Sequence, residues 1–429
     1  MIKRLLALYA FSYPYEALWI EHFDSDTIFK PYRIVGLTIL AFFALAKLAA
    51  PSRLKFDGYD LAFAGIIGGG LLLALGWYLI NGTANLSWAA SETALLTFSF
   101  LIFIVIKHEI VETRDAELLL FAFVAGTVSS VVVSKGLTPE ITYERIRGYY
   151  RNPNGLAIAS AISMQCLIAW ALFTRKGNAL KRYVISGVLC LFLAYVLLIT
   201  GSRTPIIAFA ISSLAFVVPL YRQSSRALFR VLAFLPIVVG VGIVISFVLT
   251  TADQGSVVTR YSVESAQTGS GRFDIWRSAW LVARDHYFIG VGTAQYRYHH
   301  QAYVELLTKV YSRKIDESAL GVHSDYLNLL TCYGLPLLLV YLGTLASVAG
   351  RLRKAVLDRV DSFVTPAVFA IVLLIAVNQI AHNMMQGPAY FTVMGIATGA
   401  CIAHQRQREQ RRGLDEALAE PALSTRIRA

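Results

Sequence analysis

The sequence contains little charge. Asp, Glu, Lys and Arg together make up 15% of its 429 residues, whereas 56% are hydrophobic and the mean hydropathy is +0.57. The surface of a soluble domain is normally about a quarter charged or more. The composition therefore argues against a soluble domain and favours an integral membrane protein.

Cysteines are also few. They lie in or beside apolar segments and form no CxxC pair, which argues against a disulfide framework and against a zinc site. The four are Cys166, Cys190, Cys332 and Cys401. We expect them to be small core residues. The glycines at 269 and 271 belong to no nucleotide-binding loop, because no Lys-Ser/Thr pair follows them and no strand precedes them.

Long apolar runs are abundant. A transmembrane helix needs roughly 20 residues, somewhat fewer where flanking side chains reach the interface. Twelve segments qualify, at residues 5–20, 34–50, 60–80, 90–106, 117–134, 155–173, 183–199, 206–220, 229–250, 326–349, 364–382 and 389–403. The sequence therefore predicts an all-α polytopic membrane protein of about twelve transmembrane helices, a single integral membrane domain with no internal repeat.

Basic residues gather in the connections that follow the even-numbered spans. These connections carry Arg53 and Lys55, Lys107 and Arg114, Arg175 to Arg182, Arg222 to Arg230, and Arg351 to Arg359. The positive-inside rule places them in the cytoplasm, together with both termini and a basic tail at 404–429. The positive-inside rule therefore explains the net charge of +12, and we expect no nucleic-acid partner.

The first apolar segment is predicted to be a retained span rather than a signal peptide. Tyr13, Pro14 and Glu16 interrupt it, and it lacks a small-residue cleavage site. On the opposite side of the membrane lie residues 81–91, 135–154 and 201–205, together with one insertion at 251–323. A connection of that length is uncommon unless it is functional, so we expect short helices and the active groups in it.

An arginine stands at the mouth of two predicted spans. Residues 200–205 read Thr-Gly-Ser-Arg-Thr-Pro, with Arg203 at the outer surface. A guanidinium there favours an anionic partner, either a ligand or a lipid headgroup. Ser202 and Pro205 suit the start of a helix, whose free N–H groups also favour an anion.

The insertion contains an amphipathic pattern. It predicts a helix that begins near Arg272, with Ile275, Trp276, Ala279, Trp280 and Val282 on its apolar face and a turn at Gly290 to Gly292 after it. We interpret the tryptophans as membrane-surface anchors rather than a ligand platform. At the helix start, Arg272 adds a fork of donors to the positive end of the helix dipole.

A histidine ends the insertion. His323 is followed by Ser324 and Asp325, and the tenth predicted span opens directly after them. Histidine accepts protons near neutral pH, so His323 is either a general base or a simple helix-start residue. Pairing with Asp325 would require a non-helical turn, because residues two apart on a helix do not face each other.

Two further groups lie on this side. Arg145 and Arg147 are interleaved with tyrosines ahead of Asn154, which we expect to cap the sixth span; the cluster suits phosphate and sugar, or a solvated rim. His299 and His300 lie in the insertion with acidic residues, but their spacing matches no ligand set, so we predict no metal site.

Together these motifs resemble the O-antigen ligase and polymerase superfamily of bacterial membrane glycosyltransferases. The resemblance rests on Ser202-Arg203-Thr204, Ser270-Gly271-Arg272 with Trp276, Gly290-Val291-Gly292, His323-Ser324-Asp325-Tyr326-Leu327 and Asn152-Pro153-Asn154-Gly155. It covers about residues 145–387. The family often has Asn where this chain has Ser324.

The resemblance implies a GT-C-like fold in the bacterial inner membrane. It also implies transfer of a glycan from an undecaprenyl-pyrophosphate carrier to an acceptor sugar hydroxyl on the periplasmic face, without a cofactor. Arg203 and Arg272 would hold the pyrophosphate, with Arg145, Arg147, Asn154 and Asp325 as weaker substrate-binding candidates, and His323 would act as general base. The acceptor would be lipid A core in a ligase.

Three alternatives remain open. The acceptor is a second lipid-linked glycan in a polysaccharide polymerase, or a protein side chain in an oligosaccharyltransferase. A transporter or lipid flippase is a different class, which predicts buried mid-span charges and broken helices in matching halves. Lys47 is the main mid-span charge, and no matching halves are evident.

Overall fold

A computed structural model describes residues 1–16, 18, 30–49, 54–137, 147–150, 152–174, 177–223, 272–311, 321–358 and 362–426. Every regular element in these ranges is a helix, in agreement with the all-α prediction. In chain order they are α1 (Ile2–Ser12), η1 (Tyr13–Tyr15), α2 (Pro31–Ala49), α3 (Gly58–Asn81), α4 (Leu86–Glu109), α5 (Thr113–Leu137), α6 (Pro153–Phe173), α7 (Ala179–Ile199), α8 (Arg203–Ser213), η3 (Leu214–Phe216), α9 (Val217–Gln223), α13 (Arg272–Asp285), α14 (Tyr296–Tyr311), α15 (Asp325–Asn328), η5 (Leu329–Tyr333), α16 (Gly334–Asp358), α17 (Val364–Asn378) and α18 (Pro388–Arg426).

The described helices include 8 that are long and apolar enough to cross a membrane. They are Pro31–Ala49, Gly58–Asn81, Leu86–Glu109, Thr113–Ser134, Pro153–Phe173, Ala179–Ile199, Arg203–Arg222 and Asp325–Asp358. Val364–Asn378 is a shorter apolar helix, and the predicted span 229–250 lies outside the described residues. The chain is thus a polytopic helical membrane protein, while the count of twelve spans stays a prediction.

The first predicted span differs in the structure. Residues 5–20 were expected to form one helix, but α1 ends at Ser12 and a 3₁₀ turn with Pro14 follows. Proline has no N–H to donate to the preceding turn, so the α-helix ends there. At about 1.5 Å per residue, the 11 residues of α1 cover only part of a bilayer.

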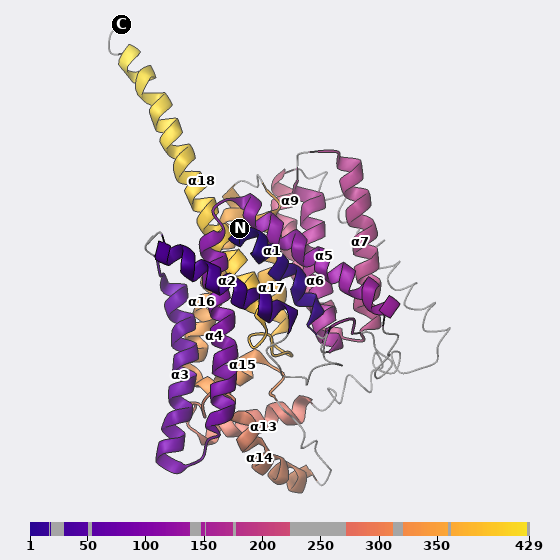
Figure 1. Cartoon of the computed structure of the whole chain (residues 1–429), viewed down its shortest axis with the longest axis vertical. Coiled ribbons are helices and arrows are strands. Elements are labelled where there is room, and N and C mark those ends of the chain that lie inside the picture. The colour runs from indigo at the N-terminus through magenta and orange to yellow at the C-terminus, as the bar shows by residue number, and fades with distance from the viewer. Residues whose placement is uncertain are drawn as a thin grey trace.

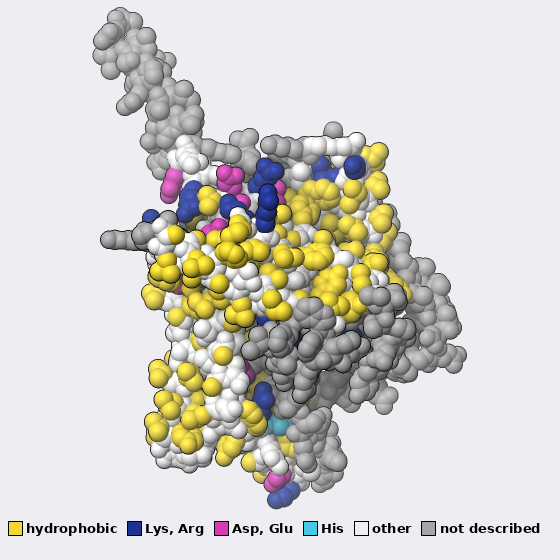
Figure 2. Space-filling model, in the orientation of Figure 1, with side chains coloured by type: hydrophobic (Ala, Val, Ile, Leu, Met, Phe, Trp, Pro, Cys, Tyr) yellow, Lys and Arg dark blue, Asp and Glu magenta, His cyan; other side chains and the backbone are white. Residues whose placement is uncertain are grey.

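The outer surface of the helical array is strongly apolar. Leu48, Leu72 and Ile80 are 79%, 68% and 77% exposed, respectively. Figure 2 shows a band of hydrophobic side chains, with Lys, Arg, Asp and Glu gathered at the end from which α18 projects. The four cysteines are buried, as expected of small core residues.

Contacts place the predicted cytoplasmic connections together at that charged end. Lys3 at the N-terminus donates to Asp115 at 2.8 Å, and Arg222 donates to the carbonyl oxygen of Leu357 at 2.7 Å. At the opposite end, the turn between α3 and α4 meets the segment before α14, where the Asn85 N–H donates to Gln295 Oε1 at 2.7 Å (Figure 1). These contacts place the α3–α4 turn at the end opposite to the Lys3–Asp115 and Arg222–Leu357 contacts, and the alternation of all the connections stays a prediction.

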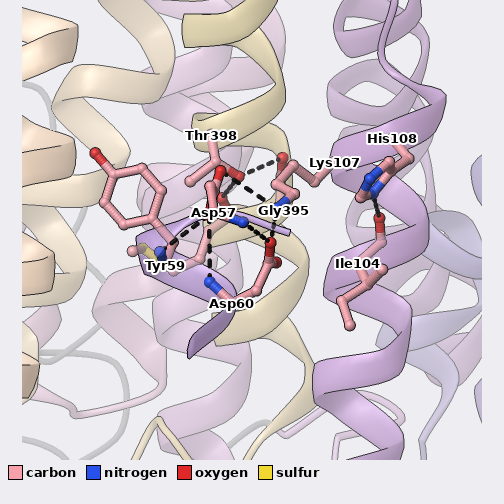
Figure 3. A network of polar contacts seen from close by, with 9 residues as sticks. Asp57, Tyr59, Asp60, Ile104, Lys107, His108, Gly395 and Thr398 are labelled. Carbon is pink, nitrogen blue, oxygen red and sulfur yellow. Dashed lines mark hydrogen bonds and ion pairs between the residues drawn. The ribbon is translucent and has the colours of Figure 1, made fainter. Parts of the chain in front are cut away.

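A buried ion cluster ties α3 to α4 at the charged end (Figure 3). The Lys107 ammonium, whose side chain is 2% exposed, donates to the equally buried Asp60 and lies 3.3 Å from Asp57. Asp57 is also the N-cap of α3, and it completes a capping box with Asp60. These charges lie at helix ends. A transporter is expected to have buried charges in the middle of its spans, so this cluster does not support that alternative.

Substitution of Lys107 by Met is expected to destabilise the protein by about 3 to 5 kcal/mol, because it leaves a buried carboxylate without its cation. Thermal unfolding in detergent measures this effect. The double variant Lys107→Met, Asp60→Asn is expected to recover part of the loss, whereas equal stability of the single variant and wild type would contradict the ion-pair interpretation.

The helix that follows His323 is interrupted by a π-helical segment, η5. The turn at residues 290–292 donates hydrogen bonds to carbonyl groups of η5: the Val291 N–H donates to Thr331 O at 2.9 Å, and the Gly292 N–H donates to Cys332 O at 2.7 Å. Gly292 has φ +96°, and a β-carbon there would collide with the backbone of Ala74. Only glycine suits this position, which explains the Gly290-Val291-Gly292 motif. The turn anchors α13 to the tenth predicted span.

Candidate functional site

Arg203 is the first residue of α8. Ser202 occupies the N-cap position, but its side chain caps no N–H group. Ser202 therefore does not satisfy the free N–H groups of the first turn of α8, which lie beside the half-buried Arg203. This end of the helix, next to a guanidinium, favours a bound anion.

Arg272 is the first residue of α13, as the sequence predicts. The helix buries Ile275, Ala279 and Val282, which confirms most of its predicted apolar face, while Trp280 is 51% exposed. The α13 helix packs against α15 and η5, which form the start of the tenth predicted span. Burial, followed by the charge of Arg203, lowers the pKa of Arg272. The two guanidinium groups are thus close enough to interact.

His323 lies in the non-helical turn directly before α15. Its backbone adopts φ +54°, a left-handed conformation in which histidine is enriched among non-glycine residues. The residue is exposed. Partial desolvation by the surrounding protein, followed by the charge of Arg272, lowers the pKa of His323 below 6.5. The imidazole is therefore mainly neutral at pH 7 and able to accept a proton.

The structure thus brings together three residues that are far apart in the sequence. Arg203 interacts electrostatically with Arg272, and Arg272 with His323. They belong to the starts of α8 and α13 and to the turn before α15. Two guanidinium groups can hold a polyanion such as a diphosphate, and a neutral imidazole beside them can remove a proton from a neighbouring hydroxyl.

Asp325 does not form the pair with His323 that was considered from the sequence. Its carboxylate is buried, and Oδ2 accepts the backbone N–H groups of Met384 at 2.8 Å and Met385 at 3.0 Å. Its own N–H donates to Gln379 O at 2.9 Å. Asp325 therefore fastens the loop between α17 and α18 to the segment that carries His323, and it does not pair with that histidine.

Arg145 and Arg147 are two of the weaker substrate-binding candidates, and the structure does not place them in the cluster of Arg203, Arg272 and His323. Arg145 is not among the described residues. No described contact joins Arg147 to the cluster; its turn contains Tyr149 and Tyr150, which are buried and pack against the tyrosines of η1. Tyr149 and Tyr150 therefore belong to the core, and a substrate-binding role of Arg145 and Arg147 stays a prediction.

Asn154 does not cap α6. The cap is Asn152, whose Oδ1 accepts the Gly155 N–H at 2.9 Å, with Pro153 as the first helical residue. Proline suits that position because its missing N–H would have no partner there. Asn154 therefore falls within the first turn of α6, half-buried.

The adjacent histidines of α14 face different surroundings. His300 is buried, and its Nδ1 lies 2.9 Å from Ser278 Oγ and 2.8 Å from the Tyr296 hydroxyl, which joins α14 to α13. The His299 ring packs against His286, and burial followed by the charge of His286 lowers the pKa of His299 to about 4. Both histidines have packing roles in the described structure.

One member of the cluster was missed in the sequence. His382 lies in the loop after α17, and it interacts electrostatically with Arg272 and His323. The available signal was a polar run, Asn378, Gln379, His382 and Asn383, at the outer end of an apolar span. Polar residues at such a depth mark candidate functional sites in a membrane protein.

The electrostatic coupling within the cluster is testable. The variant Arg272→Gln is expected to raise the pKa of His323, because it removes a nearby positive charge, while Arg272→Lys keeps the lower value. NMR titration of ring-labelled histidine in detergent measures the pKa, and His323→Ala assigns the signal. An unchanged pKa in Arg272→Gln would show that the two side chains do not interact.

The eight membrane-length helices of the described residues and the cluster of two arginines with a neutral histidine define a polytopic membrane protein with a candidate anion-binding, proton-accepting site. Residues 188–342 match the family model described as O-antigen ligase. This part of the chain is similar to a family of glycosyltransferase-like enzymes, which supports the resemblance to the O-antigen ligase and polymerase superfamily. The match contains Arg203, Arg272 and His323. No curated protein matches the chain.

Proposed function

We propose that the protein transfers a glycan from an undecaprenyl-pyrophosphate carrier to a sugar hydroxyl, as an O-antigen ligase with lipid A core as acceptor. The main observation behind the proposal is that Arg203, Arg272 and His323, which all lie in the family-matched residues, interact electrostatically with one another through Arg272. A lipid-linked donor suits a site at the end of membrane-length helices, because its prenyl tail stays in the bilayer.

The reaction is a single displacement. The acceptor oxygen attacks the anomeric carbon and forms the new glycosidic bond, while the bond from that carbon to the diphosphate oxygen breaks. His323 takes the hydroxyl proton, and the diphosphate leaves with the bonding electron pair. Arg203 and Arg272 stabilise the negative charge that develops on the leaving group. One displacement inverts the anomeric configuration, and we propose that it proceeds without a metal ion.

Membrane orientation follows from the charge pattern. We propose the bacterial inner membrane, with the charged end of Figure 2 and both termini in the cytoplasm and the Arg203, Arg272 and His323 cluster at the periplasmic face. Membrane lipids and the carrier lipid then surround the apolar exterior.

The test is transfer by the purified protein from an undecaprenyl-pyrophosphate glycan to lipid A core, in the presence of a metal chelator. Product formation supports the ligase. Product formed only when the acceptor is a second lipid-linked glycan supports a polymerase, and product formed only on a protein acceptor supports an oligosaccharyltransferase. Absence of transfer to any of these acceptors, together with lipid flipping or uptake in vesicles, would overturn the proposal in favour of a transporter.

A further inference from the structure

The loop between α17 and α18, residues 379–387, contains an unusual buried histidine. The side chain of His382 is 6% exposed, and neither ring nitrogen has a hydrogen-bond partner among the described residues. The Oδ1 atom of the neighbouring Asn383 is likewise buried without a partner. Because buried polar groups are nearly always hydrogen-bonded, these atoms call for a partner that is not part of the described chain.

This loop is firmly attached to the segment that carries His323. Two loop N–H groups donate to Asp325, while Ser324 Oγ donates to Gln379 O at 3.4 Å. A β-carbon on Gly321 would lie 2.8 Å from Asn383 Nδ2, so the two segments also touch beside the histidine turn. His323 and His382 are therefore held in one rigid unit, although 59 residues separate Asp325 from Met384.

The charge state of His382 limits what it can bind. Burial, followed by the charges of Arg272 and His323, lowers the pKa of His382 to about 3, so its ring is neutral at pH 7. A neutral imidazole has one nitrogen that donates and one that accepts. Asn383 Oδ1 adds a second acceptor. A phosphate group offers only acceptors at this pH, whereas sugar hydroxyls both donate and accept.

We propose that His382 and Asn383 form a subsite that binds hydroxyl groups of the acceptor sugar next to the base His323. The inference rests on the proposed glycan transfer and names the acceptor side of that site. His382 makes and breaks no covalent bond; it fixes the sugar ring so that the reacting hydroxyl faces His323. The diphosphate of the donor stays with Arg203 and Arg272.

The experiment is steady-state kinetics of the full-length protein with an undecaprenyl-pyrophosphate glycan as donor and lipid A core as acceptor. Loss of one hydrogen bond to a neutral group corresponds to up to about tenfold in binding. We expect His382→Ala and Asn383→Ala each to raise the acceptor KM by about that factor, while the donor KM stays within about twofold. The variant His382→Gln keeps a donor and an acceptor and is expected to regain most of the loss.

The control variant is His286→Ala, at the same end of the molecule, whose ring packs against Trp77 at a centroid distance of 5.3 Å. It is expected to leave both KM values unchanged. Should His382→Ala fail to fold, His382→Gln and Asn383→Ala still separate the outcomes. A rise in the donor KM alone would indicate that His382 and Asn383 bind the diphosphate. Unchanged kinetics would indicate that they bind only water. Either result would overturn the proposed acceptor subsite. Inactive wild-type protein, in contrast, would contradict the proposed function itself.

Discussion

His323→Ala is expected to lower the rate of glycan transfer by about 10² to 10⁴, which is the usual contribution of a positioned general base. The residue is exposed, so loss of its side chain leaves no large cavity, and the fold is expected to persist. His323→Asn is the better-matched variant, because asparagine also tolerates the φ of +54° at this position. Both variants are compared with wild type in single-turnover transfer, with thermal unfolding as the check on folding.

The pH dependence of the reaction tests the same assignment. The neutral form of His323 accepts the proton, so kcat/KM is expected to fall as the pH drops through the pKa of this group. Since desolvation and Arg272 lower that pKa, the acidic limb of the profile should lie below pH 6.5. His108→Ala, at the opposite end of the molecule, serves as the control and is expected to match wild type. Full activity of His323→Ala would remove the base from the mechanism.

Arg272→Gln is expected to reduce transfer by about 10² to 10³, the usual cost of removing one preorganised donor from a developing anion. Arg203→Gln should have a similar effect, and the double variant should lose less than the product of the two, because both guanidinium groups bind one diphosphate. Arg272→Lys keeps the charge but not the bidentate fork, so it should recover only part of the rate.

The readout for these arginine variants includes binding as well as rate. Flotation with vesicles that contain undecaprenyl pyrophosphate measures carrier binding without the chemical step, and Arg272→Gln is expected to weaken it. The control is Arg277→Gln, on the same helix but 53% exposed and paired with Asp274 at 3.9 Å. Equal losses in Arg277→Gln and Arg272→Gln would indicate damage to α13 instead of a lost phosphate contact.

The places where sequence analysis differed from the structure have local physical causes. Hydropathy extended the first span to residue 20, but Pro14 ends the α-helix because it cannot donate a hydrogen bond. Asn154 was chosen as a cap for its side chain alone, whereas the proline at 153 makes the preceding residue the cap. In both cases one proline decided a boundary that composition does not resolve.

The sequence by itself determined the membrane class and the helical fold, because apolar length is a property of short segments. It also identified Arg203, Arg272 and His323 as candidates. Only the tertiary structure decided which of them meet, that Asp325 binds a loop instead of His323, and that His382 joins the cluster. Those facts depend on contacts between segments tens of residues apart, and no local pattern encodes such contacts.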